Sequence, residues 1–123
     1  MWTVEGDHSH AIYNHFKVGP ESSNFTLTVD DYSGEAGDSL SYHSGSQFST
    51  WDHYAHPEMR NCAAEFFGGW WYNDCHKVSL NGPYYRGAQQ GSKYAAGIHW
   101  FDFTGHYNSL VRVQMMIRPP RPN

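Results

Sequence analysis

Cys62 and Cys75 are the only cysteines in the chain, and they enclose the twelve residues 63–74. Two thiols at this separation form either a disulfide bond or part of a metal site. A structural zinc site would need two further ligands, and zinc-binding cysteine pairs usually lie about two to four residues apart. The spacing therefore favours a disulfide, which predicts that the chain matures in an oxidising compartment.

Histidines are abundant, nine in all, but their spacing matches no catalytic arrangement. His8 and His10 flank a single serine and resemble a pair of metal ligands, although such pairs are more common as solvated surface. The sequence contains no nucleophile motif, phosphate-binding loop or metalloprotease helix signature. The chain is therefore predicted not to be an enzyme.

The composition is that of one loop-rich domain of 123 residues. Aromatic residues make up 17% of the chain and charged residues only 16%, which suits aromatic packing rather than a helical bundle or a disordered tail. A net charge of -4 without a basic stripe argues against a nucleic-acid partner, and no apolar run is long enough to span a membrane. Asn24-Phe25-Thr26 is a sequon that predicts N-linked glycosylation of Asn24 in a secreted chain.

Turn and strand signals predict a β-hairpin in the first third of the chain. Residues 13–18 have the composition of a strand, and the turn-forming residues 19–23 follow it. Phe25, Leu27 and Val29 then alternate with two threonines, as in a half-buried strand. Residues 33–46 are rich in Gly and Ser and predict loops, with at most one helical turn near residues 38–40.

The later part of the chain has weaker periodicity. Trp70-Trp71-Tyr72 predicts a short buried strand, and residues 73–97 predict a long, ordered, irregular segment. Apolar residues alternate from Val111 to Ile117, which predicts a closing strand with one face in the core. Pro119 and Pro120 would end that strand.

Several sequence blocks resemble the signature of the fibrinogen C-terminal domain, the family of ficolins, tachylectins, tenascins, angiopoietins and fibrinogen chains. In chain order the blocks are Tyr32-Ser33-Gly34, residues 36–43, Phe48-Ser49-Thr50, Asn61-Cys62-Ala63, residues 68–73, Cys75-His76, Leu80-Asn81-Gly82, Gly97-Ile98, Trp100 and residues 116–119. The resemblance implies an α+β fold, fibrinogen C-terminal-like, with a small antiparallel sheet, short helices and long ordered loops. It also implies that residues 1–123 form a partial domain, the central and C-terminal portion, with the N-terminal subdomain absent from this chain.

The resemblance places an acetyl-binding pocket beside the second cysteine. By analogy with ficolins and tachylectins, its walls would be Phe66, Cys75, His76, Tyr94, Ala95 and His106. It further implies a cis Asp74–Cys75 peptide bond, with the Cys75 and His76 amides as donors to an acetyl oxygen. Phe66 and His106 replace tyrosines that are usual in the family. The alternative interpretation is that these rings only pack around the disulfide.

The family also binds calcium in the loop that precedes the first of these cysteines. The positions that correspond to its two ligand aspartates are Tyr54 and His56, and Glu58 and Arg60 stand at the carbonyl positions. Calcium prefers several carboxylate oxygens, and Asp52 is the only aspartate left in this loop. The calcium site is therefore predicted to be lost, and no cofactor is expected.

Together these features predict a secreted, extracellular recognition domain. The preferred hypothesis is an innate-immune lectin that binds acetylated glycans. The alternative is an extracellular-matrix, adhesion or receptor-binding module with a protein partner, because one scaffold supports both uses. Oligomers are expected to form through regions outside this chain.

Overall fold

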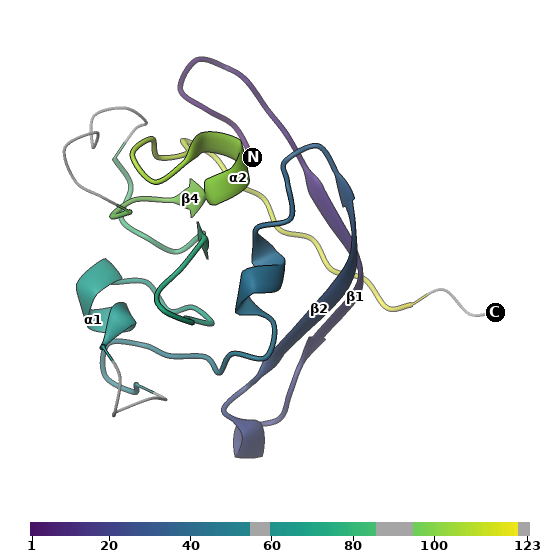
Figure 1. Ribbon diagram of the computed structural model, residues 1–123, viewed down its shortest axis with the longest axis vertical. Coiled ribbons are helices and arrows are strands. Elements are labelled where there is room, and N and C mark those ends of the chain that lie inside the picture. Colours follow the sequence, from purple (N-terminus) through teal and green to yellow (C-terminus); the bar gives the residue numbers. More distant parts are fainter. Residues whose placement is uncertain (55–59, 86–94, 121–123) are drawn as a thin grey trace.

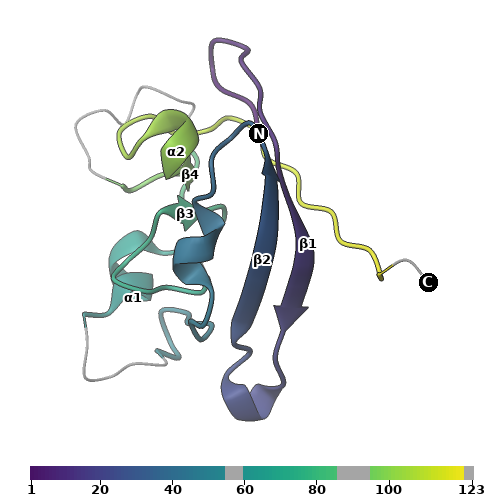
Figure 2. The same ribbon diagram turned by 45° about the vertical axis from the view of Figure 1, so that its right-hand side comes forward.

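In the computed structural model, residues 1–54, 60–85 and 95–120 are described. The fold is α+β and has little regular structure, as the resemblance implied (Figure 1). Its elements, in chain order, are β1 (Ala11–Val18), η1 (Glu21–Ser23), β2 (Leu27–Gly34), η2 (Leu40–His43), α1 (Cys62–Phe66), β3 (Val78–Ser79), β4 (His99–Trp100) and α2 (Phe101–Thr104). The long β1–β2 hairpin forms one side of the molecule, and α1, β3, β4 and α2 lie together on the other side (Figure 2).

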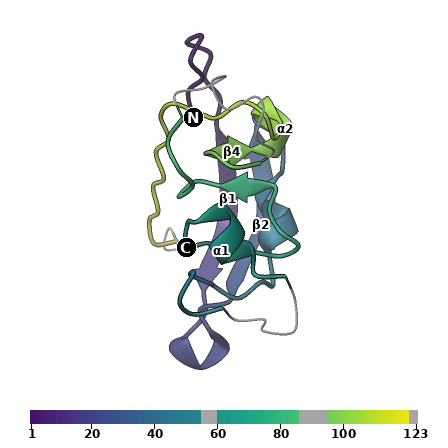
Figure 3. The same ribbon diagram turned by 90° about the vertical axis from the view of Figure 1, so that its left-hand side faces the viewer.

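The predicted hairpin is confirmed. β1 and β2 pair antiparallel, with Tyr13 opposite Tyr32 and Val18 opposite Leu27. The apolar alternation of β2 puts Leu27 and Val29 in the core at 0% and 4% exposure, while the residue between them is exposed. One face of this sheet therefore supports the irregular layer that contains α1 and β4 (Figure 3).

His43, at the end of η2, forms side-chain hydrogen bonds to backbone groups of the core. Its side chain is completely buried, and its Nδ1 donates to the Trp71 carbonyl at 2.7 Å. Its Nε2 accepts the backbone N–H groups of Lys77 and Val78, at 3.1 and 3.0 Å. Burial lowers the pKa of His43 to about 4, so the ring is neutral at physiological pH. One side chain thus provides hydrogen-bond partners for three backbone groups, the Trp71 carbonyl and the Lys77 and Val78 N–H groups.

The prediction of a strand at residues 70–72 is wrong, although the prediction that this segment is buried is confirmed for Trp70 and Tyr72. Trp70 and Tyr72 are 2% and 0% exposed, but only Trp70 pairs, in a single bridge with Ser49. The chain is also crowded just before this segment. A Cβ atom on Gly68 would lie 2.4 Å from the Asn81 carbonyl oxygen, so another loop already occupies the space beside the chain.

The predicted closing strand from Val111 to Ile117 is also wrong. The segment makes one bridge, between Arg112 and Trp2, and then continues without strand structure. Val113 still packs on the core, but Ile117 is 77% exposed. No described strand pairs with residues 113–118, so the alternating side chains lack a ladder beyond the Arg112 bridge. Figure 1 shows this segment, in yellow, running away from the body.

The short helices α1 and α2 were not located by sequence periodicity, because each is about one turn long. Within the described part of the chain, no helix has the length and apolar character needed to cross a membrane.

Candidate ligand-binding site

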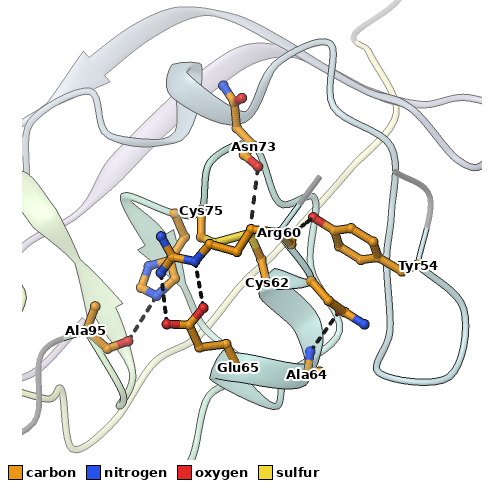
Figure 4. A network of polar contacts seen from close by, with 10 residues as sticks. Tyr54, Arg60, Cys62, Ala64, Glu65, Asn73, Cys75 and Ala95 are labelled. Atoms are coloured by element: carbon orange, nitrogen blue, oxygen red, sulfur yellow. Dashed lines mark hydrogen bonds and ion pairs between the residues drawn. A yellow bond between two sulfur atoms is a disulfide. The ribbon is translucent and has the colours of Figure 1, made fainter. Parts of the chain in front are cut away.

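A disulfide joins α1 to the segment before β3. Cys62 and Cys75 are bonded, with their Cα atoms 5.5 Å apart, which confirms the prediction from their spacing (Figure 4). Asn61 caps α1, since its side chain accepts the Ala64 N–H at 3.1 Å. Among the described residues, the only group with metal-ligand spacing is Cys62, Asp74 and Cys75. Both of its sulfurs are used in the disulfide, so the metal alternative is excluded for this pair.

Phe66, the last residue of α1 and one of the predicted site residues, packs its ring against His76. Their ring centroids are 4.8 Å apart and the rings meet edge to face, a favourable arrangement. The Arg60 guanidinium lies 5.7 Å from the centroid of the Phe66 ring. Glu65 holds this guanidinium through two hydrogen bonds of 2.6 and 2.9 Å, which fixes its position and balances its charge.

Ala95 ties the two histidines of the predicted site together. His76 Nε2 donates to the Ala95 carbonyl at 3.0 Å, and the Ala95 N–H donates to the His106 carbonyl at 2.8 Å. The His76 and His106 rings are 5.6 Å apart. Five of the six predicted wall residues, Phe66, Cys75, His76, Ala95 and His106, therefore form one cluster. Tyr94 lies outside the described residues.

Two neighbouring backbone donors distinguish this cluster from ordinary core. Cys75 and His76 are 8% and 6% exposed, and the peptide bond between Asp74 and Cys75 is cis, as the resemblance implied. Within the described ranges, neither the Cys75 N–H nor the His76 N–H donates to any acceptor. Both donors are therefore available to a ligand oxygen.

His99 is a member of the cluster that sequence reasoning missed. It lies in β4, fully buried, and stacks on His76 with ring centroids 6.1 Å apart. Its Nε2 accepts the Gly97 N–H at 3.0 Å, which assigns the ring proton to Nδ1 in the neutral form. Phe101, the first residue of α2, adds a further ring 4.6 Å from His106. No local pattern marks either residue, because β4 is only two residues long.

The three histidines give an uncharged site at neutral pH. Burial, with a smaller contribution from neighbouring imidazoles, lowers the pKa of His76 to about 3 and that of His99 to about 4. Burial and then the Lys77 charge lower the pKa of His106. Neutral rings can pack against a methyl group or a sugar face without the cost of desolvating a cation.

The described part of the predicted calcium loop, residues 52–54 and 60, offers few of the oxygen ligands that calcium requires. The Tyr54 hydroxyl donates to the Arg60 carbonyl, which is an oxygen that the resemblance assigned to the ion. The Asp52 carboxylate accepts the Thr50 hydroxyl at 2.7 Å. His56 and Glu58 lie outside the described residues. The described part of the loop therefore does not fit a calcium ion.

Comparison with known proteins identifies the family. The profile of the fibrinogen beta and gamma chains, C-terminal globular domain, matches residues 1–120. This chain belongs to the fibrinogen C-terminal domain family. Members of this family are non-enzymatic recognition domains, which confirms that the chain is not an enzyme.

Curated relatives share substantial identity with this fibrinogen C-terminal domain. Human fibrinogen C domain-containing protein 1 is 49% identical over 106 residues, which are 86% of this chain and 23% of the relative. Mouse tenascin is 39% identical over 114 residues, which are 93% of this chain and 5% of tenascin. The chain thus spans less than a quarter of the length of either relative.

Solved structures share the fold. The fibrinogen-like globe domain of human ANGPTL2 superposes with a TM-score of 0.81 at 40% identity, covering 90% of this chain and 51% of that one. Lamprey fibrin D-dimer, complexed with the peptide ligand Gly-His-Arg-Pro-amide, gives a TM-score of 0.78 at 30% identity. That match covers 89% of this chain and 40% of the lamprey chain. The chain therefore spans about half of the ANGPTL2 chain and two fifths of the lamprey chain, and it shares their fold over those parts.

Proposed function

We propose that this domain is an extracellular recognition module that binds acetylated glycans at the cluster around the Cys62–Cys75 disulfide. The observation that carries the proposal is the pair of backbone donors at Cys75 and His76, which have no acceptor among the described residues. An acetyl group presents one carbonyl oxygen next to one methyl group. Two adjacent N–H groups suit that oxygen, and an apolar surface beside them suits the methyl.

The surroundings of the two donors supply that apolar surface. The Phe66 ring, the Ala95 methyl and the neutral His76 ring lie within one hydrogen-bonded cluster. The resemblance adds Tyr94 as a further wall, as a proposal. The proposed site thus combines two backbone donors with neighbouring apolar side chains.

A single acetyl group contributes few atoms, so affinity per site should be weak, about millimolar. Useful binding would require several copies of the domain, held together by regions outside residues 1–123. The disulfide supports an extracellular location, because such bonds persist in oxidising compartments. We propose no calcium requirement, since Tyr54 already occupies the Arg60 carbonyl.

A protein partner is the second candidate function. It is favoured by the lamprey relative, which was solved with a short peptide ligand. A peptide carbonyl oxygen could accept from the same two donors in place of an acetyl oxygen. The two candidates differ in their ligands, and so a competition experiment separates them.

The test is binding of the chain, displayed multivalently, to a glycan array with N-acetylglucosamine or glucosamine as competitor. We expect acetylated glycans to be bound and only N-acetylglucosamine to compete. Tyr94→Ala should abolish this binding, whereas Phe25→Asn, which removes an exposed ring from the distant hairpin turn, should leave it intact. Binding that glucosamine displaces equally, or no glycan binding by the multivalent chain, would reject the acetyl proposal in favour of a protein partner.

A further inference from the structure

A cavity lies at the turn that connects η1 to β2, and none of its lining residues belongs to the cluster around the disulfide. Its volume is about 300 Å³, and it is lined by Asn24, Phe25, Phe48, Thr50 and His53. The Phe48 N–H donates to the Asn24 carbonyl at 2.9 Å, and Trp71 Nε1 donates to the Phe25 carbonyl at 2.9 Å. The Phe48 ring packs edge-on against Trp71, with centroids 5.3 Å apart. These contacts hold the walls in place.

Asn24 presents its side chain to this cavity from an unusual backbone conformation. Asn24 and Phe25 both have left-handed φ angles, 53° and 58°. Asparagine tolerates this region, but phenylalanine rarely adopts it. Phe25 is 44% exposed. It lines the cavity together with Asn24.

The Asn24 amide has capacity for a substituent. Its Nδ2 donates one hydrogen to Gln47 Oε1 at 3.4 Å, and the second hydrogen has no acceptor among the described residues. The third residue of the sequon, Thr26, is held by its hydroxyl, which donates to the Ser23 carbonyl at 2.7 Å. A substituted amide would keep one hydrogen, and the Gln47 contact would survive.

We propose that Asn24 carries an N-linked glycan and that its first N-acetylglucosamine residue occupies this cavity, against Phe25 and Phe48. The sugar donor is a lipid-linked oligosaccharide pyrophosphate. The bond between sugar C1 and the pyrophosphate oxygen breaks, a bond from C1 to Asn24 Nδ2 forms, and the lipid pyrophosphate leaves. Asn24 gives up one Nδ2 proton in this transfer.

The chemistry of the cavity fits a sugar at this position. Aromatic rings such as Phe25 and Phe48 contact the apolar face of a pyranose, and the Thr50 hydroxyl and His53 ring provide polar partners at the edge. The glycan would cover apolar surface that is otherwise in water. The disulfide places the chain in the oxidising pathway where such sugars are attached. This proposal is independent of the acetyl-binding cluster.

The test compares one sequence in three states. The chain secreted from a eukaryotic host gives the glycosylated state, and an endoglycosidase that leaves only the first N-acetylglucosamine gives the trimmed state. Secretion to a bacterial periplasm gives the unmodified state. Intact mass should show a glycan, and peptide mapping should locate it at Asn24. The glycosylated and trimmed states should melt at the same temperature, about 3 °C above the unmodified chain.

Two results would overturn the proposal. The first is an unmodified Asn24 in the eukaryotic product. The second is a trimmed chain that melts like the unmodified one, because the first sugar would then make no stabilising contact. As a second readout, NMR should show upfield ring-current shifts for protons of that sugar. The Phe25→Asn variant keeps the sequon, since its middle position accepts any residue except proline, and should reduce those shifts. Unchanged shifts in this variant would contradict the contact with Phe25.

Discussion

The hydroxyl group of Tyr54 donates a hydrogen bond to the backbone carbonyl of Arg60. That carbonyl is an oxygen that the family's calcium loop gives to the ion, and here it already accepts a hydrogen bond. The Arg60 side chain also brings a positive charge to the loop, although Glu65 balances it. Tyr54 and Arg60 are thus held by local hydrogen bonds that involve no divalent cation.

Thermal stability should consequently not depend on calcium. The melting temperature should be the same in millimolar calcium and in excess chelator, because only a bound ion shifts the folding equilibrium. The Tyr54→Phe variant should lose about 1 kcal/mol of unfolding free energy with the hydroxyl contact, and it should still not respond to calcium. A rise of many degrees on adding calcium to the unaltered chain would show that the loop binds the ion.

Acid should destabilise the fold in a defined window. His43, His76 and His99 have pKa values lowered to about 4, 3 and 4 from an ordinary value of 6.5, chiefly by burial. Their contribution is complete above pH 6.5 and is lost as the pH falls towards 4, because the unfolded chain takes up protons first. Each of these histidines should remove about 1.4 kcal/mol of unfolding free energy per pH unit in that window.

Urea unfolding between pH 7.5 and 4.5 measures this effect, and NMR titration of the imidazole protons assigns it to particular residues. A stability that stays constant from pH 7 to pH 5 would contradict the buried, neutral state of these rings.

Removing the His43 ring nitrogens should be severely destabilising. His43→Phe would leave the Trp71 carbonyl and the Lys77 and Val78 N–H groups without partners in the core. Unpaired buried polar groups cost about 1–3 kcal/mol each, so a loss of at least about 3 kcal/mol is expected. The same substitution at the exposed His10 should change stability by less than about 0.5 kcal/mol. Equal effects at the two positions would show that the hydrogen bonds of His43 are dispensable.

Features encoded by neighbouring residues could be predicted from the sequence. The hairpin was found from the alternation around Leu27 and Val29, and the disulfide from the spacing of Cys62 and Cys75. Features that depend on distant partners could not. Trp70 is buried as its composition indicated, but whether it pairs depends on Ser49 and on the crowded backbone beside Gly68.

The same distinction applies to the site. The resemblance named Phe66, Cys75, His76, Ala95 and His106, and the structure brings these five together. His99 was missed because its position in the cluster is created by the β3–β4 pairing, which joins two-residue strands across a long loop. The alternation from Val111 to Ile117 predicted a strand, but strand formation also needs a neighbour, and among the described residues the segment pairs only at Arg112, with Trp2.

The most direct test of the central claim is an NMR titration of the ¹⁵N-labelled chain with N-acetylglucosamine, with glucosamine as the matched control. The account predicts that the backbone amide signals of Cys75 and His76 shift strongly, because both N–H groups gain the acetyl oxygen as an acceptor. Saturation should require about millimolar sugar, and glucosamine should leave both signals unchanged. If these two amides do not respond to N-acetylglucosamine, or respond equally to glucosamine, the acetyl-binding account is contradicted.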